Sequence, residues 1–577
     1  MAAIRETWNS RTAFVLAAIG SAIGLGNIWR FPYITYENGG GAFLVAYFIC
    51  LFLAGIPLLM LEFSIGHKFH QAAPGSFKKI SPRLEWFGWF AAGVGFIIVT
   101  YYAIIMAWSV NYTYEAATLG WVQEEGEYAD VQYAITETDL EDMEVLIEVP
   151  DSLLGRGFVS PVSADQGFIL DDPPDPEGVG TILVAFGGHL YGFNSVDEAN
   201  TFMGSPADFF FNDFLGVTSS PWDMGKFKWP LFIGFTLAWI WIVASVWKGT
   251  KTVSKVVYFT VLIPWGLLLL FVIRGLTLSG AGTGIEYYLT PVWSKLMNAK
   301  IWLAAVSQVF YSLSIGFAIM IAYGSFLPKK TNIAANAMII GIADALTAFF
   351  GGLAVFSALG HHASSLGVPV SQVVSSGPGL AFVAYPHIIS TLPAARIFGV
   401  LFFLMLLTLA VDSAFSLLEA VTASVKDKWR TSHRKANLIV GISAFLLGIP
   451  MLTGMGIHIL DIADHFMNSF GLTLVVLGEV LIIGWGTGAE EQRQYINKNS
   501  SFNVGIWWNI CIRWIIPMGI LWMIFAEIKE RAVPYGSFGL RSQEFLFGWL
   551  LIILLPIIGD ILASVSGKKD LEQRTNT

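Results

Sequence analysis

Cysteines and charged residues are scarce in this chain of 577 residues. Its two cysteines, Cys50 and Cys511, both lie inside apolar runs, which argues against a disulfide framework and against a cysteine-ligated metal centre. Charged residues make up 13% of the chain and hydrophobic residues 55%, and the mean hydropathy is +0.63. Because so much apolar surface must face lipid or other buried helices, the composition indicates a polytopic membrane protein.

Motifs for nucleotide-driven or metal-dependent catalysis are also missing. The sequence has no Walker motif, so nothing in it predicts activity driven by ATP. The two histidines of "GHH" at 360–362 are adjacent rather than at metal-ligand spacing, and we interpret them as part of a loop. We therefore expect a protein that is not an enzyme and that binds no nucleic acid.

Negative charge is concentrated in one segment. Between Glu124 and Glu177 the chain has sixteen Asp and Glu and one basic residue, Arg156. The net charge of this segment is therefore about −15. Because the net charge of the whole chain is −9, the rest of the chain carries about +6. It belongs to a long predicted exterior loop, residues 117–227. Such a loop either attracts cations by its field or is simply a solvated surface, which is the plainer interpretation.

Apolar stretches long enough to cross about 30 Å of hydrocarbon occur twelve times. They lie at residues 12–36, 42–66, 87–116, 228–247, 256–275, 301–326, 335–358, 395–424, 436–454, 460–486, 505–527 and 544–565. Connections rich in Lys and Arg, such as "WKGTKTVSK" and "KDKWRTSHRK", share one side of the membrane when the spans are counted. The positive-inside rule places that side, with both termini, in the cytoplasm. We expect the N-terminal "MAAIRETWNSR" to stay on the chain, because it lacks the features of a cleaved signal peptide.

Two of the predicted spans contain a break. The first has "GSAIGLGN" at residues 20–27 and the sixth has "SQVFYSLSIGF" at residues 307–317. An unwound backbone in a membrane is tolerated only where it lines a cavity or is covered by protein. One glycine-rich break alone is equally well explained by close helix packing. Breaks at matching positions of two halves predict an interior binding site of a transporter.

Counted from these breaks, the chain divides into two five-span halves. We predict one transporter domain over residues 1–577, with an inverted repeat of residues 12–275 and 301–486 and two additional helices within residues 505–565.

Four segments carry a resemblance to a known family. They are "NSRTAFVLAAIGSAIGLGNIWRFPYITYENGGGAF" in the first span, "FYSLSIGF" in the sixth, "LTLAVDSAF" in the eighth and "SSGPGLAFVAYP" in an exterior loop. With them, nearly the whole chain resembles the neurotransmitter:sodium symporter family. The resemblance implies an all-α polytopic fold of the leucine-transporter type, with twelve transmembrane helices of which the first and sixth are broken. It also implies a plasma-membrane symporter that imports a neutral amino acid with sodium by alternating access.

The resemblance implies two sodium sites. The first would use the backbone oxygens of Gly20, Ile23 and Leu409 and the side chains of Asp412 and Ser413. A cation is the expected partner of Asp412, because a carboxylate in an apolar span is costly by itself. The second site would use the Ala22 carbonyl, Asn27, Ser312 and the substrate's own carboxylate.

One ligand of the second sodium site departs from the family pattern. The family commonly has an asparagine in the seventh span, and our ungapped match places Ala343 there, with Asp344 beside it. Either Asp344 replaces the missing ligand through a small shift in register, or the site has fewer protein ligands.

Chloride binds beside this site in some relatives. The matching positions here are Tyr47, Gln308, Ser312 and Thr347. A carboxylate at Asp344 would supply the negative charge internally and would repel an anion, so we expect transport that is independent of chloride.

The substrate pocket is inferred from the same resemblance. Carriers of amines have an aspartate where this chain has Gly24, so we expect the substrate to bring its own carboxylate. The residues expected to contact it are Ala22, Gly24, Leu25, Gly26, Ile98, Tyr102, Tyr311, Ser312, Ser314, Phe317, Ser413 and Leu417. This uncharged lining favours a neutral amino acid. Taurine or a betaine is an alternative, because one methylene changes binding by only about 1–3 kcal/mol.

Two gates are expected from the resemblance. Arg30 and Asp464 would form an ion pair on the exterior side. Arg5, Trp8, Ser325 and Asp427 would close the interior side, where Phe326 replaces a tyrosine common in the family. A channel is disfavoured because both gates are present.

A receptor-like amino-acid sensor is the competing hypothesis, and we disfavour it because we find no sizeable cytoplasmic domain. The expected partners are the amino-acid substrate, sodium ions and the lipid bilayer, and a homodimer is compatible with these expectations.

Overall fold

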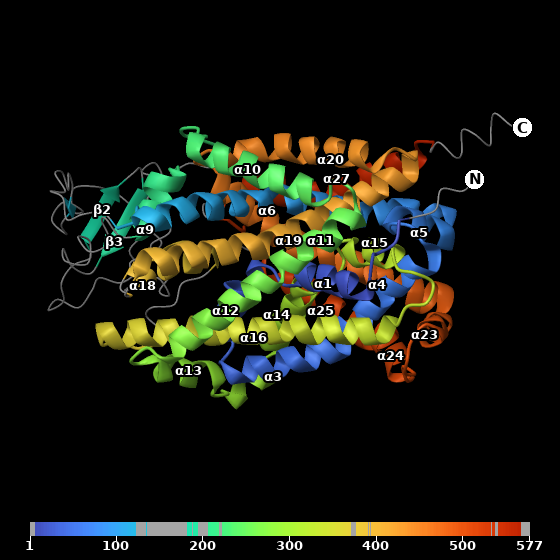
Figure 1. The fold of residues 1–577 in the computed structure, drawn as a ribbon, viewed down its shortest axis with the longest axis horizontal. Coiled ribbons are helices and arrows are strands. Elements are labelled where there is room, and N and C mark those ends of the chain that lie inside the picture. The colour runs from blue at the N-terminus through green and yellow to red at the C-terminus, as the bar shows by residue number, and fades with distance from the viewer. Residues whose placement is uncertain are drawn as a thin grey trace, which may run out of the picture.

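Helices build nearly all of this computed structural model, and most of them run along one axis (Figure 1). The structure describes residues 6–122, 206–218, 222–370, 377–390, 392, 394–531, 534–536 and 540–566, together with strand residues 134–135, 182–186 and 189–193. The main helices are α1 (Arg11–Ala22), α2 (Arg30–Glu37), α3 (Gly41–Cys50), α4 (Ile56–Phe69), α6 (Glu85–Thr118), α10 (Trp229–Ser245), α11 (Thr250–Thr260), α12 (Leu262–Leu276), α13 (Ala281–Leu289), α14 (Ala299–Ser312), α15 (Ile319–Ser325), α16 (Ile333–Leu366), α19 (Ala395–Trp429), α20 (His433–Gly448), α21 (Gly456–Phe466), α22 (Thr473–Leu481), α23 (Ala489–Lys498), α25 (Ile516–Glu530) and α27 (Leu550–Ser564).

The predicted spans correspond to these helices. Among the described residues, nine helical segments are long and apolar enough to cross a membrane, and the bent pair of α1 and Leu25–Glu37 makes a tenth. The 17-residue α10 takes the place of the fourth predicted span, and the sixth is divided between α14 and α15. The predicted all-α polytopic fold with a broken first and a broken sixth helix is therefore confirmed.

A small sheet is the exception to the helical fold. Strands β1 (Ala134–Ile135), β2 (Ile182–Phe186) and β3 (His189–Phe193) pair antiparallel in the order β1-β2-β3. All three lie within the predicted exterior loop 117–227. The acidic residues between Glu124 and Glu177 lie outside the described residues.

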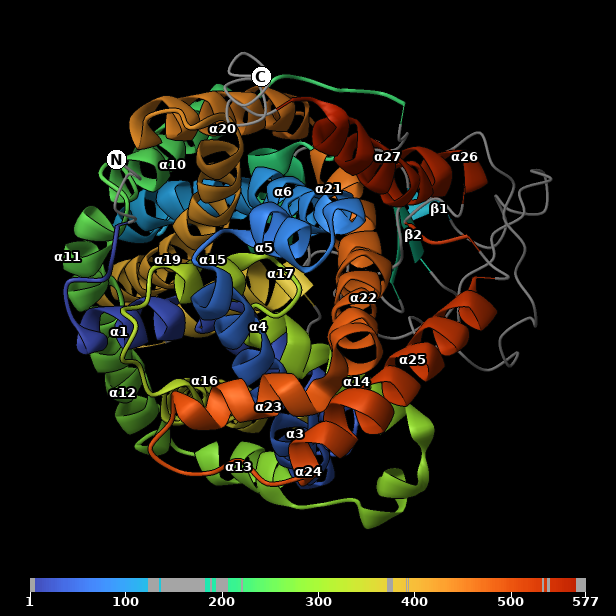
Figure 2. The ribbon, with the colours of Figure 1, turned by 90° about the vertical axis from the view of Figure 1, so that its right-hand side faces the viewer.

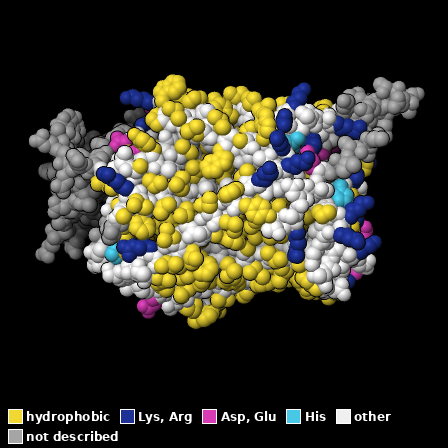
Figure 3. Space-filling model, viewed as in Figure 1, with side chains coloured by type: hydrophobic (Ala, Val, Ile, Leu, Met, Phe, Trp, Pro, Cys, Tyr) yellow, Lys and Arg dark blue, Asp and Glu magenta, His cyan; other side chains and the backbone are white. Residues whose placement is uncertain are grey.

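The two ends of the bundle differ in character. Both chain termini lie at one end, and the strands lie at the other (Figure 1). Between them the surface is a broad apolar belt, and Lys and Arg gather toward the end that bears the termini (Figure 3). Large apolar side chains such as Ile273, Phe525 and Ile561 are more than half exposed on this belt. Such a belt is the surface expected of a protein in lipid.

The broken helices occupy the interior of the bundle. Helix α1 packs against α11, α16 and α19, and α15 packs against α4. Seen along the bundle, α10, α20, α25 and α27 lie around the outside (Figure 2). In the most apolar stretch of the span that contains α6, 83% of the residues are buried. In the span that contains α27, only 22% are buried. The breaks are therefore shielded from lipid by other helices.

Glycines let α4 and α15 approach each other closely. A Cβ atom added at Gly66 would lie 2.0 Å from the carbonyl oxygen of Ile321, and one added at Gly324 would lie 2.7 Å from that of Phe63. No side chain larger than hydrogen fits at these contacts without moving a backbone. Small residues at helix crossings are the usual means of close packing in membranes.

We expect Gly66→Val to destabilise the folded protein by separating α4 from α15. Overpacking of this kind costs about 1–3 kcal/mol or more, so the variant in detergent should unfold several degrees below the wild type in a thermal scan. Gly266→Val is the matched control, because an added Cβ at Gly266 of α12 meets nothing within 4 Å. Equal losses in the two variants would contradict the packing argument.

Candidate functional site

The first helix break frees backbone oxygens. Helix α1 ends at Ala22, Ile23 and Gly24 are extended, and a short turn at Leu25–Asn27 leads toward α2, with a bend of 61° across the pair. The Gly24 amide donates to Asn27 Oδ1 at 3.2 Å, and the Asn27 amide donates to the Gly24 carbonyl. The amides that would bond the carbonyls of Gly20 and Ile23 in a continuous helix are therefore directed elsewhere.

The second break is held by contacts to two other helices. Between α14 and α15, the residues Ser314, Gly316 and Ala318 have φ values of 54°, 83° and 60°. The Ser314 hydroxyl donates to the Ser21 carbonyl at 2.8 Å, which connects the two breaks directly. The Gly316 amide donates to Glu62 Oε1 at 2.8 Å. These bonds satisfy backbone and side-chain groups that lipid would leave unpaired.

A cavity lies between the two breaks and brings together eleven of the twelve residues predicted to contact substrate. Leu25 is not among the lining residues, but its amide donates to the Tyr102 hydroxyl at 3.3 Å. The cavity volume is about 30 Å³, so the lining side chains leave little free space between the breaks in this conformation. The lining also includes Ser21, Asn27 and Ile319. Ser21 belongs to the first break, so the sequence could have predicted it as a lining residue. The orientation of Ile319 depends on the path of the second break, which the sequence does not give.

The residues of the first predicted sodium site lie close together. Asp412 on α19 is 1% exposed, and its Oδ1 atom has no hydrogen-bond partner among the described residues. A Cβ atom at Gly20 would lie 2.5 Å from Asp412 Oδ2, so the break in α1 passes directly beside the carboxylate. The Ser413 hydroxyl donates to the Ser21 carbonyl at 3.2 Å. A buried, incompletely bonded carboxylate beside free carbonyls is a donor set that suits a hard cation such as Na⁺.

Asp344 lies among residues predicted for the second sodium site. Its fully buried carboxylate accepts bonds from Asn27 Nδ2 at 2.9 Å, from the Tyr47 hydroxyl at 3.3 Å and from the Ser312 hydroxyl. Of the two alternatives left open by the sequence, the structure places Asp344 with the predicted ligands. Ala343 has no oxygen to contribute from its side chain.

The four residues predicted for chloride have different bonding partners. The hydroxyls of Tyr47 and Ser312 donate to Asp344, and Gln308 is fully buried, with no partner for its amide among the described residues. Thr347 instead accepts a bond from Trp265 Nε1 at 3.0 Å and donates to the Ala343 carbonyl at 2.8 Å. Its hydroxyl is therefore engaged with α12 and with its own helix.

The expected exterior ion pair is not formed in this conformation. No Arg30–Asp464 contact within 4 Å occurs among the ion pairs of the described residues, although the two charges lie near enough to interact. Arg30 Nη2 donates instead to the Ser307 hydroxyl at 3.1 Å, and its guanidinium lies 4.9 Å from the centre of the Tyr311 ring. The guanidinium thus lies against α14, where a hydroxyl and an aromatic face compete with the carboxylate.

Trp8, one of the residues predicted for the interior gate, packs against the end of α15. Its indole N–H donates to the Tyr323 carbonyl and its amide to the Phe326 carbonyl, both at 3.1 Å, and the side chain is 6% exposed. Asp427 Oδ2 accepts a bond from the Ala72 amide at 2.8 Å, whereas the Ser325 hydroxyl bonds a carbonyl of its own helix. Arg5, the remaining predicted gate residue, lies outside the described residues.

Two of the buried carboxylates that our prediction did not include lie near the second break or interact with a group that does. Glu62 of α4 and Glu479 of α22 are both fully buried, and they lie close enough to interact electrostatically. Glu62 holds the second break through Gly316. An acidic residue inside an apolar span is a functional signal that is readable from sequence, so Glu62 was open to prediction.

Two interrupted helices that face each other across a buried cavity, with free carbonyls and carboxylates beside it, define a secondary transporter. The comparison with known proteins makes the class specific. The profile of the sodium:neurotransmitter symporter family matches residues 5–144 and 192–565, and the chain belongs to this family. Its members are sodium-dependent transporters, not enzymes.

Relatives of this chain are found from archaea to animals. An uncharacterised sodium-dependent transporter of Methanocaldococcus jannaschii is 34% identical over 97% of both chains. The sodium- and chloride-dependent glycine transporter 2 of Xenopus laevis is 31% identical, over 96% of this chain and 69% of its own length. The human sodium- and chloride-dependent neutral and basic amino acid transporter B(0+) is 31% identical, over 99% of this chain and 87% of its own length.

We expect Glu62→Leu to destabilise the second break, because it leaves the Gly316 amide buried without an acceptor. That loss costs about 1–3 kcal/mol, and it should lower the unfolding temperature in detergent and weaken sodium-dependent thermal stabilisation. Glu62→Gln is the matched control, since its amide oxygen still accepts the Gly316 bond. If Gln is as damaging as Leu, the charge rather than the acceptor is what matters and the prediction is wrong.

Proposed function

We propose that this protein is a sodium-coupled symporter that imports a neutral amino acid. One observation carries the proposal: the cavity between the breaks has no charged side chain in its lining, while a buried carboxylate with an unpartnered oxygen lies directly beside it. With Gly24 in the lining, the site offers no fixed anion to the amine of a substrate. The substrate therefore supplies its own carboxylate, and sodium compensates the buried negative charge.

The proposed binding mode follows the polarity of the cavity. The substrate carboxylate meets the amides of Leu25 and Gly26 and the Tyr102 hydroxyl, which are grouped at the first break. The ammonium group meets backbone carbonyls of the two breaks. The side chain of the substrate packs against Ile98, Phe317 and Leu417, so we expect it to be apolar and small or medium in size.

Coupling between ion and substrate arises from shared elements. In the proposed mechanism one sodium ion bridges α1 and α19 beside Asp412, and another binds among Asn27, Ser312, Asp344 and the substrate carboxylate. Each ion stabilises the conformation in which both breaks close on the substrate, which is a coupling free energy between sites. A membrane potential of 100 mV contributes about 2.3 kcal/mol per sodium charge to uphill import.

The proposed orientation rests on the distribution of basic residues. Lys and Arg gather toward the end of the bundle that bears both termini (Figure 3). By the positive-inside rule, we place that end in the cytoplasm and the strands outside the cell, with the protein in the plasma membrane.

We expect proteoliposomes of the wild-type protein to accumulate one labelled amino acid from a mixed set when the sodium gradient is directed inward. Asp412→Ala should reduce accumulation to the level seen with K⁺ alone, because the site loses its only ionisable ligand. Asp560→Ala is the matched control, since Asp560 is exposed near the end of α27.

Other outcomes of this experiment discriminate between functions. Sodium-dependent binding in detergent without accumulation favours an amino-acid sensor. Accumulation of taurine or a betaine instead of an amino acid corrects the substrate class. If the wild type neither binds nor accumulates any of these compounds, the inference drawn from Gly24 is wrong.

Transport should be independent of chloride, because Asp344 occupies the hydroxyls of Tyr47 and Ser312 that an anion would need. We expect equal wild-type uptake in chloride and in gluconate. Asp344→Asn removes the charge with little change in shape, so its uptake should fall several-fold in gluconate and recover in part with chloride. A wild type that requires chloride would contradict this assignment.

A further inference from the structure

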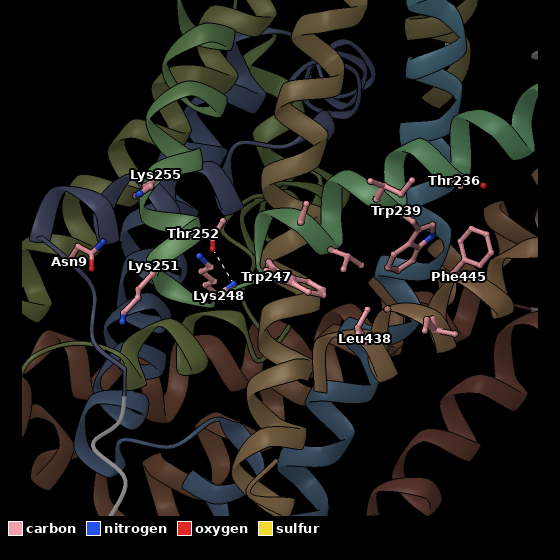
Figure 4. A pocket seen from close by; sticks show the side chains of 15 residues that line it. Asn9, Thr236, Trp239, Trp247, Lys248, Lys251, Thr252, Lys255, Leu438 and Phe445 are labelled. Atoms are coloured by element: carbon pink, nitrogen blue, oxygen red, sulfur yellow. Dashed lines mark hydrogen bonds between the residues drawn. The ribbon is translucent and has the colours of Figure 1, made fainter. Parts of the chain in front are cut away.

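A large groove lies on the outer face of the bundle. It shares no lining residue with the substrate cavity. Its volume is about 890 Å³, within the size range of ligand sites. The residues that line it come from α10, the turn between α10 and α11, α11, α20 and the segment before α1, and include Trp239, Lys248, Lys251, Lys255 and Phe445 (Figure 4).

Most of the groove is apolar and open to the membrane. Helices α10 and α20 supply its walls, with Trp239 and Phe445 at the end remote from the lysines (Figure 4). Ile240 is 60% exposed and Ile442 is 55% exposed, so both side chains face the hydrocarbon rather than the protein core. This part of the groove therefore presents the chemistry of an acyl-chain binding surface.

One end of the groove is strongly basic. Lys248, Lys251 and Lys255 line it and are all exposed, and Asn9 lies at the same end (Figure 4). No ion pair within 4 Å involves any of the three lysines among the residues that the structure describes. Glu6, whose carboxylate lies beside Gly249, pairs with Lys426 at 3.2 Å. The three lysine charges are thus available to an anion.

We propose that this groove binds an anionic phospholipid, with its phosphate at Lys248, Lys251 and Lys255 and an acyl chain along α10 and α20. The groove has a basic end and an apolar end. A ligand that fills both must therefore be an amphiphile, with a negative charge at one end and an apolar chain at the other. Basic pockets between transmembrane helices on the cytoplasmic side are suited to such head groups. The lysine stems also cover apolar surface while their ammonium groups reach the phosphate.

The site joins elements that belong to the transport machinery. Helix α11 packs against α1, which carries the first break, and Asn9 lies just before α1. A lipid bound here contacts the cytoplasmic base of α1 without touching the substrate cavity.

Native mass spectrometry of the full-length protein tests this proposal. The protein is purified in mild detergent, mixed with phosphatidylglycerol or phosphatidylethanolamine, and the lipid retained per molecule is measured. We expect one phosphatidylglycerol to be retained in preference to phosphatidylethanolamine. The variant with Lys248→Gln, Lys251→Gln and Lys255→Gln should retain about tenfold less.

The matched control carries Lys329→Gln, Lys330→Gln and Lys498→Gln, which remove the same charge from exposed positions outside the groove. Equal loss in both triple variants would overturn the site, since it would reflect net charge alone. Thermal unfolding without added lipid establishes that each variant is folded.

Two further measurements separate a lipid from a soluble phosphate. Ala244→Trp fills the apolar part of the groove and leaves the lysines in place, so it should also reduce phosphatidylglycerol retention. Inorganic phosphate should give no stabilisation. Full retention by Ala244→Trp, or stabilisation by inorganic phosphate equal to that by the lipid, would overturn the acyl-chain part of the proposal.

Discussion

The structure depends on how two stretches of unwound backbone are satisfied inside a membrane. Each unpaired amide or carbonyl costs several kcal/mol in hydrocarbon, so a break survives only if other groups replace its helical bonds. Here the replacements come from three places: Ser314 of the second break bonds the Ser21 carbonyl, Asn27 bonds the Gly24 amide within the first break, and Glu62 of α4 bonds the Gly316 amide. The first of these bonds joins the two breaks, and the third fixes the second break to α4.

Buried carboxylates around the breaks differ in how completely they are bonded. Asp344 accepts three hydrogen bonds from Asn27, Tyr47 and Ser312, whereas Asp412 keeps an oxygen without a partner among the described residues. An ionised group with free oxygens is more costly to bury and gains more from a cation. The carboxylate of Asp412 is therefore less completely bonded than that of Asp344, although both are buried.

Trp8 and Arg30, both predicted as gate residues, have bonded partners in this conformation, and Arg30 does not form the expected ion pair. Trp8 is bonded to two carbonyls beneath α15. Arg30 lies against Ser307 and Tyr311 rather than in contact with Asp464. Arg30 therefore bonds α14, the helix that leads into the second break.

The sequence by itself determined the elements that follow from length and composition. Twelve apolar stretches had to form helices, because only an internally bonded backbone crosses lipid, and "GSAIGLGN" and "SQVFYSLSIGF" had to be interior because their backbones are interrupted. Family resemblance then located most of the cavity lining. Tertiary structure alone decided which side chains meet. Each residue turns a helix by about 100°, so a one-residue difference in register separates Asp344, which bonds Asn27, from Ala343. The partner of Arg30 and the groove between α10, α11 and α20 likewise depend on how separate helices pack. No local sequence pattern encodes that packing.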